Sequence, residues 1–153
     1  ISMSRDEMCT YWLDLINGHN LKVLEDPFHE HHFDSWQYLT TNQSKCKIIG
    51  DNLYSVDAEM IAECISKNYT HGIILKTNHA GSVSNTIKAI KLVQQHNHML
   101  IMSHRSISTE STFLAYISNK YNTAYIKNGP IFTDYSSVIR LNEFIRLTGL
   151  GYE

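Results

Sequence analysis

Five short apolar runs recur along the chain, separated by longer segments with a different periodicity. Each run is aliphatic or β-branched and is bounded by polar turn residues, as is typical of a buried strand. The runs cover residues 21–24, 46–49, 72–75, 99–103 and 124–126. Strands that alternate with helices indicate a parallel sheet with right-handed crossovers.

The segments between the runs repeat their apolar residues every three or four positions, which places them on one face of a helix. Ser4 begins such a segment before the first strand, with Met8, Trp12 and Ile16 on one side and Gly18 near its end. The later segments are headed by Asp34, Asp57, Ser82 or Ser84, Thr109 and Asp134. We therefore expect one helix followed by five strand–helix units.

Charged residues stand at or just after the end of each predicted strand, at intervals of 23 to 28 residues. They are Glu25, Asp51, Lys76, His104 with Arg105, and Lys127. In a closed parallel barrel the carboxyl ends of the strands gather around one mouth, whereas an open doubly wound sheet spreads them along an edge. Taken singly, each residue fits an ordinary solvated loop. Five at this spacing favour the barrel.

This set of side chains supports a specific chemistry. Glu25 and Asp51 on adjacent strands supply the hard oxygen ligands that Mg²⁺ prefers. A lysine near a divalent cation gives up its proton more readily and can act as a base. Removing a proton next to a carboxylate produces a dianionic enediolate, which a metal and a second lysine would stabilise. The imidazole, guanidinium and two hydroxyls of residues 103–106 suit a phosphate group.

The segments that carry these residues resemble enolase, the Mg²⁺-dependent phosphopyruvate hydratase of glycolysis. They are Leu-Glu-Asp-Pro-Phe-His-Glu at 24–30, Ile-Gly-Asp-Asn-Leu at 49–53, Leu-Lys-Thr-Asn at 75–78, Ser-His-Arg-Ser at 103–106 and Ile-Lys-Asn-Gly at 126–129. The resemblance implies that residues 1–153 are the C-terminal part of a TIM (β/α) barrel, about five βα units of the usual eight. It also implies a capping domain and the first barrel strands upstream, and a cytoplasmic homodimer for the full-length protein.

The resemblance also implies roles for single residues. Lys76 would take the proton from carbon 2 of 2-phosphoglycerate, and Lys127 would pair with the substrate carboxylate, as the reaction proceeds to phosphoenolpyruvate. The remaining residues implied at the site are Glu25 and Asp51 for Mg²⁺ and substrate, Arg105 and Ser106 for the phosphate, and His104 for the substrate.

The sequence departs from the family pattern at three places. Asn52 stands where a second acid is usual, residues 107–108 replace Gly-Glu, and residues 133–137 replace a basic Arg-Ser-Glu-Arg motif. These changes motivate a second hypothesis, a non-enzymatic scaffold or binding protein with this fold. A lyase acting on a sugar acid is a third, although such enzymes usually lack the Ser-His-Arg-Ser segment.

The third metal carboxylate and the general acid of enolases would lie upstream of residue 1. We therefore expect the isolated segment to be inactive. Its two open sheet edges predict either that it belongs to a longer protein or that it self-associates.

Composition excludes other classes of function. The formal net charge of −2 gives no attraction to nucleic acid or an anionic membrane, and no apolar run approaches the roughly 18 residues of a membrane span. Hydrophobic residues make up 42% and charged residues 18%, which indicates one globular domain. Three cysteines without a CxxC pair and a polar start favour a reduced, cytoplasmic setting. His29, His31 and His32 fall in a segment expected to be a solvated loop rather than a metal site.

Overall fold

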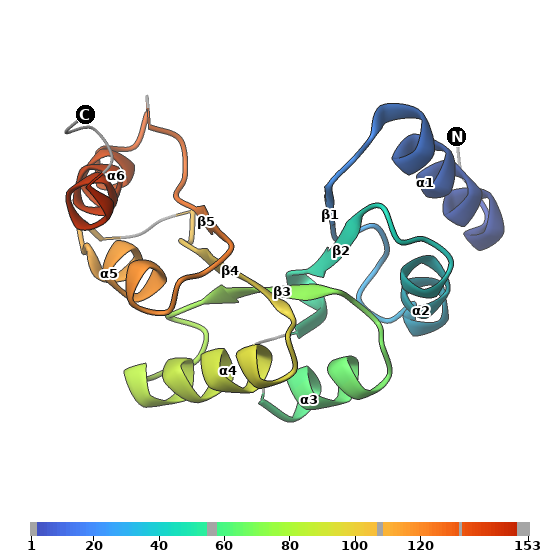
Figure 1. Cartoon of the computed structure of the whole chain (residues 1–153), viewed down its shortest axis with the longest axis horizontal. Coiled ribbons are helices and arrows are strands. Elements are labelled where there is room, and N and C mark those ends of the chain that lie inside the picture. Colours follow the sequence, from blue (N-terminus) through green and yellow to red (C-terminus); the bar gives the residue numbers. More distant parts are fainter. Residues whose placement is uncertain (1–2, 55–57, 107–108, 132, 150–153) are drawn as a thin grey trace.

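The computed structural model describes residues 3–54, 58–106, 109–131 and 133–149. Helices and strands alternate along it, beginning with a helix (Figure 1). The elements are α1 (Arg5–His19), β1 (Val23–Glu25), α2 (Phe33–Thr41), β2 (Lys47–Gly50), the 3₁₀ helix η1 (Asn52–Tyr54), α3 (Ala58–Ser66), β3 (Gly72–Lys76), α4 (Val83–Gln95), β4 (Met99–Ser103), α5 (Phe113–Lys120), β5 (Tyr125–Lys127) and α6 (Tyr135–Thr148). Within the described residues, no helix is both long and apolar enough to cross a bilayer.

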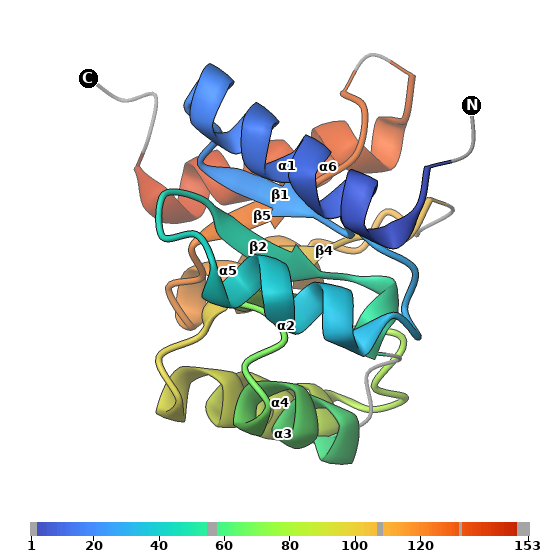
Figure 2. The same cartoon turned by 90° about the vertical axis from the view of Figure 1, so that its right-hand side faces the viewer.

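The five strands form one parallel sheet in the order of the chain, β1-β2-β3-β4-β5. The sheet curls into a half-barrel, and the helices cover its convex side (Figures 1 and 2). A doubly wound sheet would reverse its strand order and carry helices on both faces. The observed order is that of a (β/α) barrel, so the barrel interpretation is confirmed.

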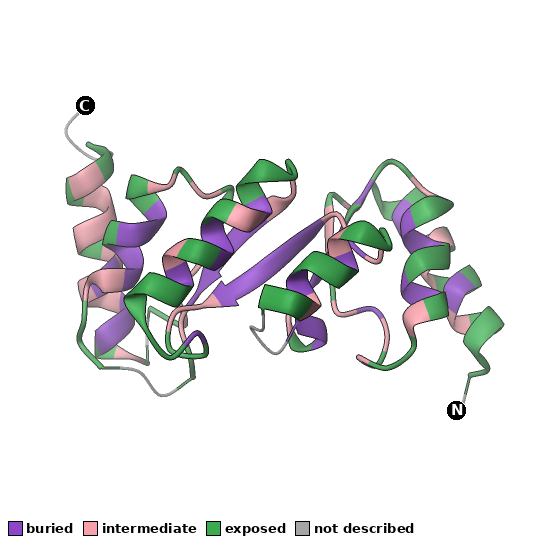
Figure 3. Ribbon diagram, turned by 90° about the horizontal axis from the view of Figure 1, so that it is seen from below, coloured by how far each residue is buried: buried purple, intermediate pink, exposed green. Residues whose placement is uncertain are grey.

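The core has two layers, because neighbouring residues of a strand point to opposite faces of the sheet. Ile48, Ile73 and Leu75 face the helices and belong to the larger apolar cluster. Ile49 and Ile74 alternate with them and form a smaller cluster on the other face, together with Ile101. The view from below shows that the outward faces of α3 and α4 are largely exposed, as expected of helices that cover a sheet (Figure 3).

The predicted starts of α1 and α4 are confirmed, and that of α2 differs. Ser4 caps α1 in a capping box with Glu7, and Gly18 lies near the end of the helix as predicted, since α1 ends at His19 and its C-cap Asn20 is in the left-handed conformation. The N-cap of α2 is His32, and Asp34 lies in the first turn, where its charge favours the positive end of the helix dipole. Ser82 rather than Ser84 caps α4. Asp57, the expected head of α3, lies outside the described residues.

The start of α5 is the largest difference. It begins at Phe113 rather than near Thr109, and the N–H of Phe113 donates to the hydroxyl of Ser111 at 3.2 Å. The carbonyl of Thr109 accepts instead from the side chain of Arg140, at 3.3 Å. The segment that periodicity assigned to a helix thus begins as a loop over the carboxyl ends of the strands.

Gly72 begins β3 between two neighbouring strands, and its lack of a side chain is required there. A Cβ at this position would lie 2.5 Å from the carbonyl oxygen of Met99 and 2.8 Å from a methyl group of Ile49. We expect Gly72→Ala to lower the free energy of unfolding by about 1–3 kcal/mol. Chemical denaturation measures this change in the free energy of unfolding.

The matched control is Gly18→Ala in α1, where a Cβ would meet nothing within 4 Å. That change should leave stability unchanged or raise it by up to about 1 kcal/mol, since alanine favours helix more than glycine does. Equal effects of the two substitutions would contradict the close packing at Gly72.

Candidate active site

The parallel register brings the predicted charged residues to one rim of the sheet. Glu25, Lys76 and Lys127 are the last residues of β1, β3 and β5. Asp51 follows β2 directly, and His104 follows β4. Because every strand runs in the same direction, all five side chains start from the same end of the sheet.

Ion pairs connect four of these residues. The ammonium of Lys76 lies 2.6 Å from Asp51, and that of Lys127 lies 2.7 Å from Glu25 and 3.8 Å from the other oxygen of Asp51. The side chains of Asp51 and Lys76 are 11% and 17% exposed, against 38% and 41% for Glu25 and Lys127. The Asp51–Lys76 pair is therefore the better shielded from water, and the Lys127–Glu25 pair joins the two edge strands across the curl.

A cavity of about 330 Å³ opens beside this network. It is lined by Asp51, Asn52, Lys76, His79, Ser103, His104, Arg105, Ser106 and Lys127. Three of its lining side chains are basic, Lys76, Arg105 and Lys127, and a single carboxylate, Asp51, opposes them. Such a balance of charge favours an anionic ligand. Glu25 reaches the network through Lys127 but does not line the cavity.

His104 is packed against the loop that follows β5. Its backbone N–H donates to the carbonyl of Lys127 at 3.0 Å, and a Cβ on Gly129 would lie 2.5 Å from its ring. Gly129 has a φ of +93°, which few other residues adopt. Burial lowers the pKa of His104, and the charge of Arg140 lowers it further. A neutral imidazole is therefore favoured at the rim.

Asp26 positions the loop that carries Asp51, a role that the sequence reasoning missed. Its carboxylate accepts the backbone N–H of Asp51 at 2.8 Å, and it accepts both the backbone and the side-chain amide of Asn52, at 3.1 and 3.0 Å. Asp26 has a φ of +42°, a conformation that aspartate tolerates better than most residues. The only sequence signal was its place beside Glu25 in Glu-Asp-Pro, which by itself reads as a loop.

His79 is a second residue that the sequence analysis did not assign to the site. It follows β3 in a turn closed by its backbone N–H and the carbonyl of Lys76, 3.0 Å apart, and it lines the cavity. Burial lowers the pKa of His79, and Arg105 and Lys76 lower it further. Position after a strand was the available signal, because His79 stands only three residues beyond Lys76.

The two carboxylates fit a divalent cation as part of its ligand set. Glu25 and Asp51 face a common point, since the ammonium of Lys127 approaches oxygens of both. Among the described residues there is no group of three histidine, cysteine or acidic side chains that could hold a metal. Mg²⁺ is often bound by one or two carboxylates together with water and substrate oxygens, so two ligands suffice for a partial site.

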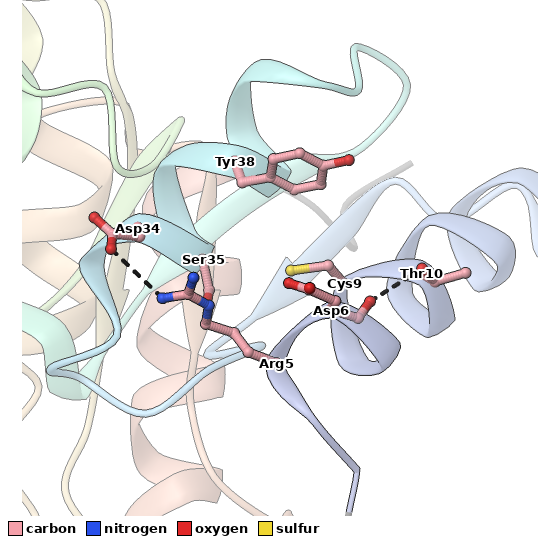
Figure 4. Close-up of a pocket in the computed structure, with 7 residues that line it drawn as sticks. All are labelled: Arg5, Asp6, Cys9, Thr10, Asp34, Ser35 and Tyr38. Carbon is pink, nitrogen blue, oxygen red and sulfur yellow. Dashed lines mark hydrogen bonds and ion pairs between the residues drawn. The ribbon is translucent and has the colours of Figure 1, made fainter.

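Other features lie apart from this rim. His29, His31 and His32 are exposed, as expected of a solvated loop. Another cavity, about 420 Å³, lies between α1 and α2 and contains the exposed ion pair of Arg5 and Asp34 (Figure 4). None of the predicted rim residues lines it.

Replacing Asp26 tests whether it positions the loop after β2. Asp26→Asn keeps the tolerance for positive φ but turns one acceptor oxygen into a donor that faces N–H groups. We expect it to lower the free energy of unfolding by about 1 kcal/mol or more and to shift the amide resonances of Asp51 and Asn52. Asp14→Asn, on an exposed position of α1, is the control and should change neither. Unmoved amide resonances in Asp26→Asn would contradict this role.

Comparison with known proteins agrees with the fold. Residues 1–150 match the family described as "Enolase, C-terminal TIM barrel domain". The chain is 30% identical to the enolase of Picrophilus torridus over 95% of its own length, and 32% identical to that of Archaeoglobus fulgidus over 97%. It is 35% identical to the enolase of Helicobacter hepaticus over 80% of its length.

The chain spans 36% of the length of the first two relatives and 29% of the third. The match nonetheless extends over nearly all of its own residues, and the parallel, sequentially ordered half-barrel is the architecture that the match requires. The chain belongs to the enolase family.

Proposed function

We propose that the protein containing this chain is an enolase, which dehydrates 2-phosphoglycerate reversibly to phosphoenolpyruvate with Mg²⁺. The observation that carries the proposal is the pair of lysines, Lys76 and Lys127, that face one cavity from alternate strands and are each held by a carboxylate. A cation-lined cavity of this kind suits a small substrate with both a carboxylate and a phosphate.

In this proposal Lys76 accepts the proton from carbon 2 of the substrate. Asp51, 2.6 Å from its ammonium, stabilises the charge that Lys76 acquires. Loss of that proton transfers negative charge to the substrate carboxylate, which the ammonium of Lys127 neutralises. Mg²⁺, held in part by Glu25 and Asp51, would supply further charge stabilisation.

The phosphate is assigned to the loop after β4. Arg105 and Ser106 line the cavity there and together offer a planar donor fork and a hydroxyl. His104 adjoins them, and its imidazole contacts the substrate in this assignment. The general acid and the third metal carboxylate are expected from the part of the enzyme that precedes this chain.

A catalytically impaired scaffold or binding protein is the second candidate. The departures at residues 107–108 and 133–137 favour it. The structure accommodates another departure, because the amide of Asn52 donates to Asp26, where an aspartate would place two carboxylates side by side. The change at Asn52 therefore weighs less than its sequence suggests.

The proposal is tested by measuring the turnover of 2-phosphoglycerate by the full-length protein. The ultraviolet absorbance of phosphoenolpyruvate reports the reaction, once with Mg²⁺ and once with a chelator. We expect activity only with Mg²⁺, and we expect Lys76→Ala to lower kcat by about 100-fold or more, because it removes the base. Lys88→Ala, on an exposed position of α4, is the control and should leave kcat unchanged. A folded full-length protein without turnover would favour the scaffold.

A further inference from the structure

Arg140 on α6 is the most deeply buried charged side chain at this end of the described structure, with 2% of its surface exposed. A guanidinium out of water is stable only where its donors and its charge are matched by partners. Here the pairing includes an ion pair with Asp134, 3.7 Å away, and a hydrogen bond to the hydroxyl of Ser137 at 3.2 Å. Its other partners belong to the loops that carry the rim residues.

Two of these bonds reach the loop after β5. The guanidinium donates to the carbonyl of Asn128 at 2.9 Å and to its side-chain oxygen at 3.2 Å. Asn128 follows Lys127 directly. Its amide donates in turn to the carbonyl of Ser137 at 2.7 Å, so the position of Lys127 is tied to the first turn of α6.

A third bond reaches the loop after β4. The guanidinium donates to the carbonyl of Thr109 at 3.3 Å, four residues beyond Arg105. One buried side chain thus joins the loop that carries His104 and Arg105 to the loop that carries Lys127. The N–H of His104, bound to the carbonyl of Lys127, joins the same two loops directly.

Arg140 also adds a cation next to His104. The Nδ1 atom of His104 is buried and has no hydrogen-bond partner among the described residues. The charges of Arg140 and Lys127 disfavour protonation of the ring, while the charge of Asp134 and a hydrogen bond with the backbone of Arg105 favour it. Burial and Arg140 are the two largest influences, and both lower the pKa of His104.

We propose that Arg140 is a positioning residue of the active site: it joins the loops after β4 and β5 and so fixes where His104 and Lys127 lie relative to one another. The proposal rests on the proposed function, because it assigns Arg140 to the enolase reaction. Arg140 does not line the cavity that Lys76 and Lys127 face, so it acts through His104 and Asn128.

The test compares Arg140→Gln with Arg140→Lys in the full-length protein. Arg140→Gln removes both the positive charge and the planar set of guanidinium N–H donors. We therefore expect kcat to fall about 10- to 100-fold, as for other residues that orient an active site. The change in KM should be smaller. The pKa of His104, followed by NMR titration of its ring, should rise. Arg140→Lys keeps the charge, so it should retain the titration of His104 while kcat recovers only in part.

Arg146→Gln is the control on the same helix. Arg146 pairs with Glu143 on the surface, and its loss should leave both kcat and the titration unchanged. If Arg140→Gln fails to fold, Ser137→Ala replaces it. We expect Ser137→Ala to lower kcat as well, but by a smaller factor. A variant at Arg140 that lowers thermal stability alone, with kcat and the His104 titration as in the wild type, would overturn the proposal.

The titration separates this proposal from the proposed function. Should the wild-type protein show no turnover, the enolase assignment fails, while the His104 titration and the affinity for inorganic phosphate in Arg140→Gln still decide the role of Arg140. An unchanged titration together with an unchanged phosphate affinity would then reject it.

Discussion

The position of every charged side chain at the rim depends on the hydrogen-bonded register of five parallel strands. Each strand pairs with the next in chain order, and the last residue or the first one after it carries the functional group. Because the sheet curls, the edge strands β1 and β5 come close enough for Lys127 to reach Glu25, a contact between residues 102 positions apart. A slip in register by one residue would turn these side chains to the other face of the sheet.

Such a cluster of charges needs support from outside itself. Asp26 supplies it at the end of β2, where it accepts the N–H groups of the residues that follow the strand. Arg140 supplies it at the ends of β4 and β5. Both act on backbone groups, and they fix where a loop runs and thereby where its functional side chain begins. Supporting residues of this kind tune a metal or a base as much as its direct ligands do.

The departures from the family pattern have different structural weight. Asn52 has become part of the support for Asp51, since its amide binds Asp26. The segment that replaces the basic motif contains Asp134, which caps α6 through Ser136 and pairs with Arg140. In this chain, therefore, a replaced segment contributes to the packing that holds Lys127. The change removes basic residues from the loop without leaving it unanchored.

The sequence by itself determined the order of elements, the barrel class and the residues at the strand ends, because a buried strand and an amphipathic helix each impose a local periodicity. The helix cap at Ser4 could also be predicted from the sequence, because a capping box lies within four residues. Tertiary structure decided the rest. The loop before α5 is bound by Arg140 far along the chain, and the role of Asp26 depends on a loop 25 residues away. Arg140 was connected to the site only through contacts between distant segments, and such contacts leave no periodic signal in a single sequence.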